Sequence, residues 1–159
     1  MTSLPSGASP SADLGYPTVT TYNVSRDSRF LFSHLVDRGA NGCVIGSDLR
    51  FIAPHNKSTH LTGVGDNTIR DLPLVSAGGV SRSNQGDVII VFNWGAHLPD
   101  GRSIACPGQM EHFGWTIDDK SYILTGHIPT PTSLEGYVFP LETRDSLLFL
   151  ETRPCTDAE

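Results

Sequence analysis

Short apolar runs separated by turn-forming residues dominate the sequence. Runs of four to eight residues rich in Val, Ile, Phe and Tyr, bounded by Gly, Pro, Asn and Asp, are typical of β-strands. The strand-like segments are residues 16–24, 30–36, 43–45, 49–52, 72–77, 87–94, 137–141 and 147–150. Residues 54–59 form a polar connection between two of them, and residues 61–69 contain a candidate turn at Asp66 and Asn67.

One segment departs from the strand pattern. Residues 103–114 begin as a strand, and Pro107 then suits the first position of a short helix that Gly114 ends. Residues 115–124 predict a further strand pair, which turns at Asp118 and Asp119. The pattern therefore predicts an all-β domain with one short helix, closed into a barrel or a folded sheet.

A glycine-rich polar stretch lies in the middle of the chain. Residues 78–86 separate the strand-like runs 72–77 and 87–94, and they include Gly78, Gly79, Val80 and Gly86. Two strands around such a tip make a β-hairpin. A tip with few anchoring side chains is expected to be mobile, which suits a lid over a cleft.

Composition and charge narrow the class of protein. A chain of 159 residues is expected to form one domain with a substantial core, and 16 glycines with 11 prolines favour many turns. The net charge is −6 and no Lys/Arg cluster occurs, which disfavours a nucleic-acid or anionic membrane partner. Residues 1–15 are rich in Ser, Pro, Gly and Ala and predict a disordered linker, followed by a domain over 16–152 and a polar tail over 153–159.

The cysteines and histidines show no ligand or disulfide pattern. Three cysteines without a Cys-x-x-Cys spacing favour free thiols in a reducing compartment. Cys43 lies in an apolar run and is expected to be a buried core thiol. Neither a membrane-length apolar run nor a signal segment is present, so a cytoplasmic location is expected. No metal site and no cofactor are predicted.

The strand over residues 30–36 ends in an acid that small residues follow at once. The sequence there is Asp37-Arg38-Gly39-Ala40. A carboxylate delivered to a tight loop in this way is either a turn cap or a catalytic acid or base. The sequence contains neither a Gly-x-Ser-x-Gly elbow nor a phosphate-binding P-loop.

The Asp-x-Gly-Ala loop resembles the active-site loop of retropepsin-like aspartic proteases, whose pattern is Asp-Thr/Ser-Gly-Ala. Wider stretches resemble the protease domain of copia-type (Ty1/copia) retrotransposon polyproteins, particularly from algae and other protists. These stretches are LVDRGANGCVIGSDLRFI (35–52), DLPLVSAGG (71–79), SIACPGQMEHFG (103–114) and LEGYVFPLETRDSLLFLETRPCTD (134–157). The resemblance covers most of residues 20–157, and only the Asp loop is chemically specific.

The resemblance implies a closed-barrel aspartic endopeptidase that processes a polyprotein as a homodimer, in the cytoplasm or within a virus-like particle. Chemistry supports the dimer independently, because two carboxylates are needed, one ionised and one protonated, and this chain has one such loop. A two-fold axis through this loop would place the Asp37 side chains of the two subunits side by side. Gly39 and Ala40 would shape the cleft floor, and the hairpin with Gly78, Gly79, Val80 and Gly86 would close over an extended peptide.

Arg38 departs from the family pattern, in which a Thr or Ser hydroxyl braces the two loops across the dimer. Arg38 cannot accept a hydrogen bond and carries a permanent charge. Either it reaches outward to a carboxylate such as Asp48 and braces the loop from the other side, or the brace is lost. The second case predicts a weak or inactive peptide-binding or dimerisation module. A third hypothesis is a structural β-domain in which Asp37 only caps a turn.

Overall fold

The computed structural model describes residues 33–159, which contain eleven strands and two helices. The predicted linker over 1–15 and the predicted strand over 16–24 lie outside the described residues. The elements are β1 Ser33–Val36, β2 Val44–Ile45, β3 Arg50–Thr62, β4 Thr68–Ser83, β5 Gly86–His97, β6 Ile104–Ala105, α1 Pro107–His112, β7 Thr116–Asp118, α2 Tyr122–Thr125, β8 Thr130–Thr132, β9 Leu141–Arg144, β10 Leu147–Glu151 and β11 Arg153–Pro154.

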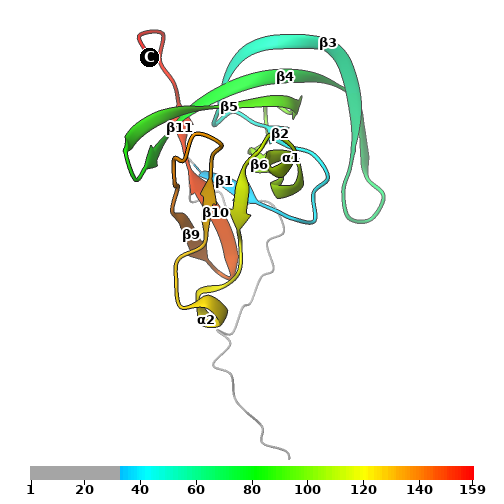
Figure 1. Cartoon of the computed structure of the whole chain (residues 1–159). Helices are drawn as coiled ribbons and strands as arrows, with labels where there is room; N and C mark the ends of the chain where they lie inside the picture. Colours follow the sequence, from blue (N-terminus) through cyan, green and yellow to red (C-terminus); the bar gives the residue numbers. More distant parts are fainter. Residues whose placement is uncertain (1–32) are drawn as a thin grey trace, which may run out of the picture.

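Nine strands form one large mixed sheet (Figure 1). Its order is β11-β4-β5-β2-β6-β1-β10-β9, with β3 paired to β4, while β7 and β8 form a separate pair. The predicted all-β class is confirmed. The strand order does not close on itself within residues 33–159, so the described sheet is not a closed barrel. Neither helix in this part of the chain has the length and apolarity needed to cross a membrane.

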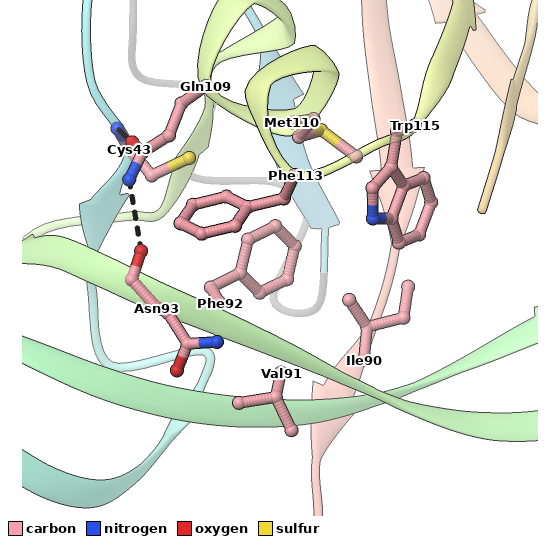
Figure 2. Close-up of a pocket in the computed structure, with 9 residues that line it drawn as sticks. All are labelled: Cys43, Ile90, Val91, Phe92, Asn93, Gln109, Met110, Phe113 and Trp115. Carbon is pink, nitrogen blue, oxygen red and sulfur yellow. Dashed lines mark hydrogen bonds between the residues drawn. The ribbon is translucent and has the colours of Figure 1, made fainter. Parts of the chain in front are cut away.

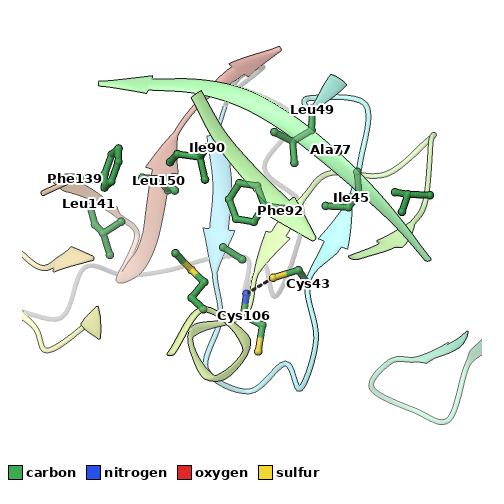
Figure 3. Close-up of a cluster of buried hydrophobic side chains, with 13 residues drawn as sticks. Cys43, Ile45, Leu49, Ala77, Ile90, Phe92, Cys106, Phe139, Leu141 and Leu150 are labelled. Atoms are coloured by element: carbon green, nitrogen blue, oxygen red, sulfur yellow. Dashed lines mark hydrogen bonds between the residues drawn. The ribbon is translucent and has the colours of Figure 1, made fainter. Parts of the chain in front are cut away.

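The core lies on one face of β5 and is completed from the C-terminal half of the chain (Figure 3). Along β5 the buried Ile90 and Phe92 alternate with the exposed Ile89 and Val91, as the two-residue period of a strand requires. Burying side chains of this size stabilises the fold by about 1.5–3 kcal/mol each. The buried cluster also includes Ile45, Leu49, Val75, Ala77, Met110, Phe139, Leu141 and Leu150.

The predicted hairpin over residues 72–94 exists as β4 and β5, but the predicted position of its tip is wrong. Gly78, Gly79 and Val80 are buried inside β4 and pair with Val91, Ile90 and Ile89 of β5. A Cβ atom at Gly79 would lie 2.6 Å from the Leu49 side chain. The glycines therefore permit close packing within a strand. They do not form a mobile lid.

The turn between β4 and β5 comes later, at Asn84 and Gln85. It is tied to the body of the protein, because Asn84 N–H donates to the Val138 carbonyl and Val138 N–H donates to Asn84 Oδ1, both at 2.9 Å. Gly86 follows the turn with a φ of 107°, which suits glycine. Figure 1 shows this turn at one end of the sheet and the loop after β1 on the opposite side. A substrate-covering role for Gly86 is therefore not supported.

Residues 54–59, expected to be a polar connection, belong to β3. The strands β3 and β4 form a long hairpin with a turn over residues 63–67, as the Asp66 and Asn67 pair predicted. Since β5 pairs with β4 only from Leu74 onward, the outer part of this hairpin is a two-stranded ribbon. Its side chains are mostly exposed. This hairpin is the projecting element of the described fold.

Two other predictions near the C-terminal half need correction. The expected strand pair over residues 115–124 is one strand, β7, followed by the short helix α2. The last hairpin is formed by β9 and β10 over 141–151, so the first predicted strand, 137–141, was placed too early. The helix predicted to begin at Pro107 is confirmed as α1, with Pro107 in its first turn.

A buried polar cluster joins β1 to the segments that precede β3 and β6 and follow β10. His34 of β1 is fully buried and shares a hydrogen bond of 2.8 Å between its Nε2 and the Thr152 hydroxyl. Asp48 Oδ1 accepts hydrogen bonds from the Ser103 amide and hydroxyl at 3.0 and 2.7 Å. The Asp48 Oδ2 atom lies 3.6 Å from His34 Nε2. Burial lowers the pKa of His34 to about 4, although the Asp48 carboxylate acts in the opposite direction.

The low pKa of His34 predicts a loss of stability in acid. The unfolded chain takes up this proton near the ordinary pKa of 6.5, whereas the folded protein resists it until pH about 4. Stability is therefore full above pH 6.5 and falls as the pH drops toward 4, by about 2–3 kcal/mol from this group. Urea unfolding at pH 7 and pH 4.5 measures the change. A His34→Gln variant should lose this part of the pH dependence, and His112→Gln, at an exposed position, should retain it. Equal pH dependence in all three proteins would contradict the prediction.

Candidate active site at the Asp37 loop

Asp37 stands at the carboxyl end of β1, a strand flanked on both sides. β1 runs parallel to β6, with Val36 opposite Ala105, and antiparallel to β10. The Asp37 amide donates to the Ala105 carbonyl at 3.0 Å, so the ladder to β6 extends as far as the acid. Asp37 is half-buried. The sheet therefore fixes the backbone of the acid and leaves its side chain partly accessible.

Gly39 holds the carboxylate within the loop. Its amide donates to Asp37 Oδ1 at 2.8 Å, and the Ala40 amide donates to the Asp37 carbonyl at 3.2 Å to close the turn. A Cβ atom at Gly39 would lie 3.0 Å from Asp37 Oδ1, a contact that few Cβ atoms make. A residue with a side chain at position 39 would therefore displace the carboxylate.

Arg38 turns away from Asp37 and binds two acids. Its Nη1 and Nη2 donate to the two carboxylate oxygens of Glu111 at 3.2 and 2.9 Å, and its Nε donates to Asp119 Oδ2 at 2.5 Å. These hydrogen bonds, first those to Glu111, raise the pKa of Arg38 further above its usual range. The expected partner Asp48 is instead buried against Ser103. Arg38 therefore braces the loop from outside, against α1 and the end of β7.

Gln109 of α1 joins the far end of the loop to β5 (Figure 2). Its Oε1 accepts from the Cys43 amide at 2.7 Å. Its Nε2 donates to the carbonyls of Asn93 and Trp94 at 3.0 and 3.3 Å. One side-chain amide thus satisfies three backbone groups on two segments, beside the point where the Ala96 amide donates to the Cys43 carbonyl.

Cys106, which precedes α1, completes the attachment of the Asp37 loop. Its thiol donates to the Ala40 carbonyl at 3.1 Å and accepts from the Gln109 amide at the start of α1 at 3.3 Å. The Cys106 amide in turn donates to Cys43 Sγ at 3.3 Å. The loop from Asp37 to Cys43 is therefore held at its start, middle and end by β6 and α1.

A cleft of about 260 Å³ lies beside this attachment, between β5 and α1 (Figure 2). It is lined by Cys43, Ile90, Val91, Phe92, Asn93, Gln109, Met110, Phe113 and Trp115. Burial raises the pKa of the Cys43 thiol to about 11, so this sulfur stays protonated and is a poor nucleophile. The predicted core role of Cys43 is confirmed, and the cleft offers no acid or base of its own.

The structure brings together the residues of the predicted acid loop and separates them from the predicted flap residues. Asp37, Arg38, Gly39 and Ala40 form one loop, whereas the glycine-rich part of β4 lies within the sheet. The sequence indicated no role at this site for Gln109, Glu111 or Asp119, although Asp119 was expected in a turn. Two of these fall in the stretch SIACPGQMEHFG, where polar residues at the start of a short helix could have indicated contacts with a neighbouring loop.

Replacing Gln109 tests how the loop is attached. Leu is similar in size to Gln but cannot form hydrogen bonds. In a Gln109→Leu variant the Cys43 amide and two β5 carbonyls therefore lose their partner, which should reduce the free energy of unfolding by about 1–3 kcal/mol. Chemical denaturation measures it. The matched control is Gln85→Leu at an exposed turn, where we expect a change within about 0.5 kcal/mol. An equal effect of the two substitutions would show that Gln109 does not carry the attachment.

Comparison of the chain with protein-family models, with curated proteins and with solved structures yields no match.

Proposed function

We propose that this protein is an aspartic endopeptidase of the retropepsin-like type, active as a homodimer on an extended segment of a retroelement polyprotein. The observation that carries the proposal is the loop Asp37-Arg38-Gly39-Ala40, in which a half-buried carboxylate at the end of a central strand receives an amide hydrogen bond from its own loop. The proposed fold is supported by the all-β sheet and by the order of strand, acid loop, strand and helix around Asp37.

One Asp37 is insufficient for the proposed chemistry, so a homodimer is part of the proposal. Peptide hydrolysis by carboxylates needs one ionised group to take a proton from water and one protonated group to bind the substrate carbonyl. Two Asp37 side chains about 3 Å apart across a two-fold axis would share one proton, and their titration would belong to the pair. Asp37 of each chain is the proposed catalytic residue. No cofactor enters this mechanism.

The contacts of Arg38 are compatible with such a pair. Two guanidinium groups near one axis would repel each other, but here Glu111 and Asp119 neutralise each of them within its own chain. Because these groups are partly exposed, each ion pair contributes at most about 1 kcal/mol to stability. Their main consequence is geometric. They keep the positive charge directed toward Glu111 of α1 and toward Asp119.

The hairpin of β3 and β4 is the proposed cover for the bound peptide, in place of the stretch 78–86. Its ribbon projects beyond the sheet, and its turn over residues 63–67 is exposed. Figures 1 and 3 both show the turn on the side of the molecule toward which the loop of residues 37–42 projects. A two-stranded ribbon whose side chains are mostly exposed opens at low free-energy cost, as a substrate cover requires.

A second candidate is a peptide-binding or dimerisation module with the same fold and without catalysis. Arg38 favours it, since the position offers no hydroxyl that could bridge two loops. The two candidates differ in one property, which is cleavage that depends on Asp37.

The first experiment is cleavage of an unstructured peptide library by the wild type and by Asp37→Asn at acidic and neutral pH. An amide in place of the shared acid cannot transfer the proton, so we expect cleavage to fall by at least 10³-fold without a change in thermal stability. Asp100→Asn, in an exposed turn, should cleave as the wild type does. Cleavage that survives Asp37→Asn would refute the proposed mechanism, and a wild type that dimerises and binds peptides without cutting them would support the second candidate.

Gly39→Ala tests whether the position of the carboxylate matters. The added methyl group would meet Asp37 Oδ1, so we expect a loss of turnover of at least tenfold with little loss of stability, since position 39 is exposed. The matched control is Gly108→Ala, where a Cβ atom would meet only the Cys106 thiol at 3.9 Å. Peptide turnover and melting temperature, measured together, separate the two effects. Unchanged turnover in Gly39→Ala would mean that the observed carboxylate position is not the catalytic one.

A further inference from the structure

One edge of β5 has no partner strand along most of its length. β4 pairs with the first edge of β5 from Gly86 to Ala96, whereas β2 pairs with the second edge only at Ala96 and His97. No other strand within residues 33–159 pairs with this second edge. We call its stretch from Asp87 to Val91 the open β5 edge. A strand edge of this kind presents backbone N–H and C=O groups to which another strand can bind.

The register of the β4–β5 hairpin determines which backbone groups face outward. Ser83 and Gly86 flank its two-residue turn, so they form a hydrogen-bonded pair, and every second pair along the ladder does the same. Ile90 belongs to such a pair and therefore bonds to β4. The N–H and C=O groups of Ile89 and Val91 point the other way, toward the open β5 edge. No other segment of the described chain forms a hydrogen bond with them on that side.

The open β5 edge lacks the features that usually protect an exposed strand edge. Proteins place Pro or charged side chains, especially Lys, on such edges to prevent pairing with other chains. β3, an outer strand of the same sheet, contains both Pro54 and Lys57. Residues 88–92 read Val-Ile-Ile-Val-Phe and contain neither, and Ile89 and Val91 are 43 and 49% exposed. An uncharged run of high β-propensity favours the addition of a strand.

The cleft between β5 and α1 lies against the open β5 edge. Four consecutive residues of β5, from Ile90 to Asn93, line this cleft. Because neighbouring residues of a strand point to opposite faces, a wall that includes all four is the edge of the strand. Phe113 and Trp115 line the other side, and Figure 2 shows their rings turned toward β5. Gln109 Nε2 donates to the Asn93 carbonyl, so this group also faces away from β4.

We propose that the open β5 edge binds an extended peptide segment of a partner protein, which adds to the sheet as a strand beside β5. Its backbone pairs with Ile89 and Val91, and one large apolar side chain enters the cleft against Phe113 and Trp115. In this mode main-chain hydrogen bonds give affinity, and pockets for alternate side chains give specificity. Unpaired groups that recur at every second residue match another strand better than any compact ligand. The site is separate from the chemistry proposed for Asp37 and does not depend on it.

Amide hydrogen exchange of the full chain tests the edge directly, in an Asp37→Asn background where the proposed cleavage is absent. In the free protein the amides of Ile89 and Val91 should exchange at least tenfold faster than those of Ile90 and Phe92, which bond to β4. The probes are synthetic peptides of the form Lys-Thr-Val-Thr-X-Thr-Val-Thr-Lys, with Phe, Leu, Met or Trp at X. Binding of at least one of them should slow the exchange of the two outward amides at least tenfold.

Two comparisons show whether the peptide binds as a strand. Methylation of one alternate set of peptide nitrogens should weaken binding at least tenfold, and methylation of the other set should change it within about twofold. In the protein, Ile89→Pro removes an outward N–H without removing a bond to β4, so it should also weaken binding at least tenfold. The matched control Ile89→Thr keeps this N–H and should bind as the parent does. The methylated peptides decide the question if Ile89→Pro does not fold.

The outcomes separate this inference from the proposed function. Protection of Ile89 and Val91 without a peptide overturns the inference. It assigns the edge to a second copy of the chain if the protection disappears on dilution, and to residues 1–32 if it does not. Failure of every peptide to protect these amides, or equal effects of the two methylated sets, overturns it as well. Binding to the Asp37→Asn protein supports the inference even where the wild type cuts no peptide.

Discussion

The loop that carries Asp37 is held by β6 and α1, and the position of the acid depends on this attachment. The parallel ladder between β1 and β6 ends at the hydrogen bond from the Asp37 amide to the Ala105 carbonyl. From there Cys106, Gln109 and Glu111 bind the loop at Ala40, Cys43 and Arg38. Since a six-residue helix has little stability of its own, these contacts also hold α1 in place. Loop and helix therefore stabilise each other.

Behind the loop the same strands are joined by buried polar groups. His34 precedes Asp37 by three residues, and Asp48 and Ser103 connect the start of β3 to the start of β6. Such a network is stabilising only while its groups keep their partners and their charge state. The chemistry proposed for Asp37 and the stability of its scaffold thus respond differently to acid, because a shared proton is needed at the dyad whereas a proton on His34 opposes folding. The protein should have a lower pH limit that its scaffold sets.

The sequence allowed the strand class, the helix at Pro107 and the acid loop to be predicted, because each depends on neighbouring residues. Alternation in β5 and a proline at the first turn of α1 are local signals. Gly78 and Gly79 were wrongly placed in a turn. A glycine in a turn and a glycine packed against a leucine cannot be distinguished in the sequence alone. The contacts of Arg38 with Glu111 and Asp119 join residues more than seventy positions apart, so no local pattern indicates them. The pairing of two chains is even harder to predict from local sequence patterns.

Binding stoichiometry tests the central claim most directly. A cleaved peptide would be resynthesised with a hydroxyethylene group in place of the scissile amide, to mimic the tetrahedral transition state, and titrated into the protein by calorimetry. A dyad shared by two chains predicts one bound peptide for every two chains, and no comparable affinity for Asp37→Asn. One bound peptide for each chain would contradict the shared site.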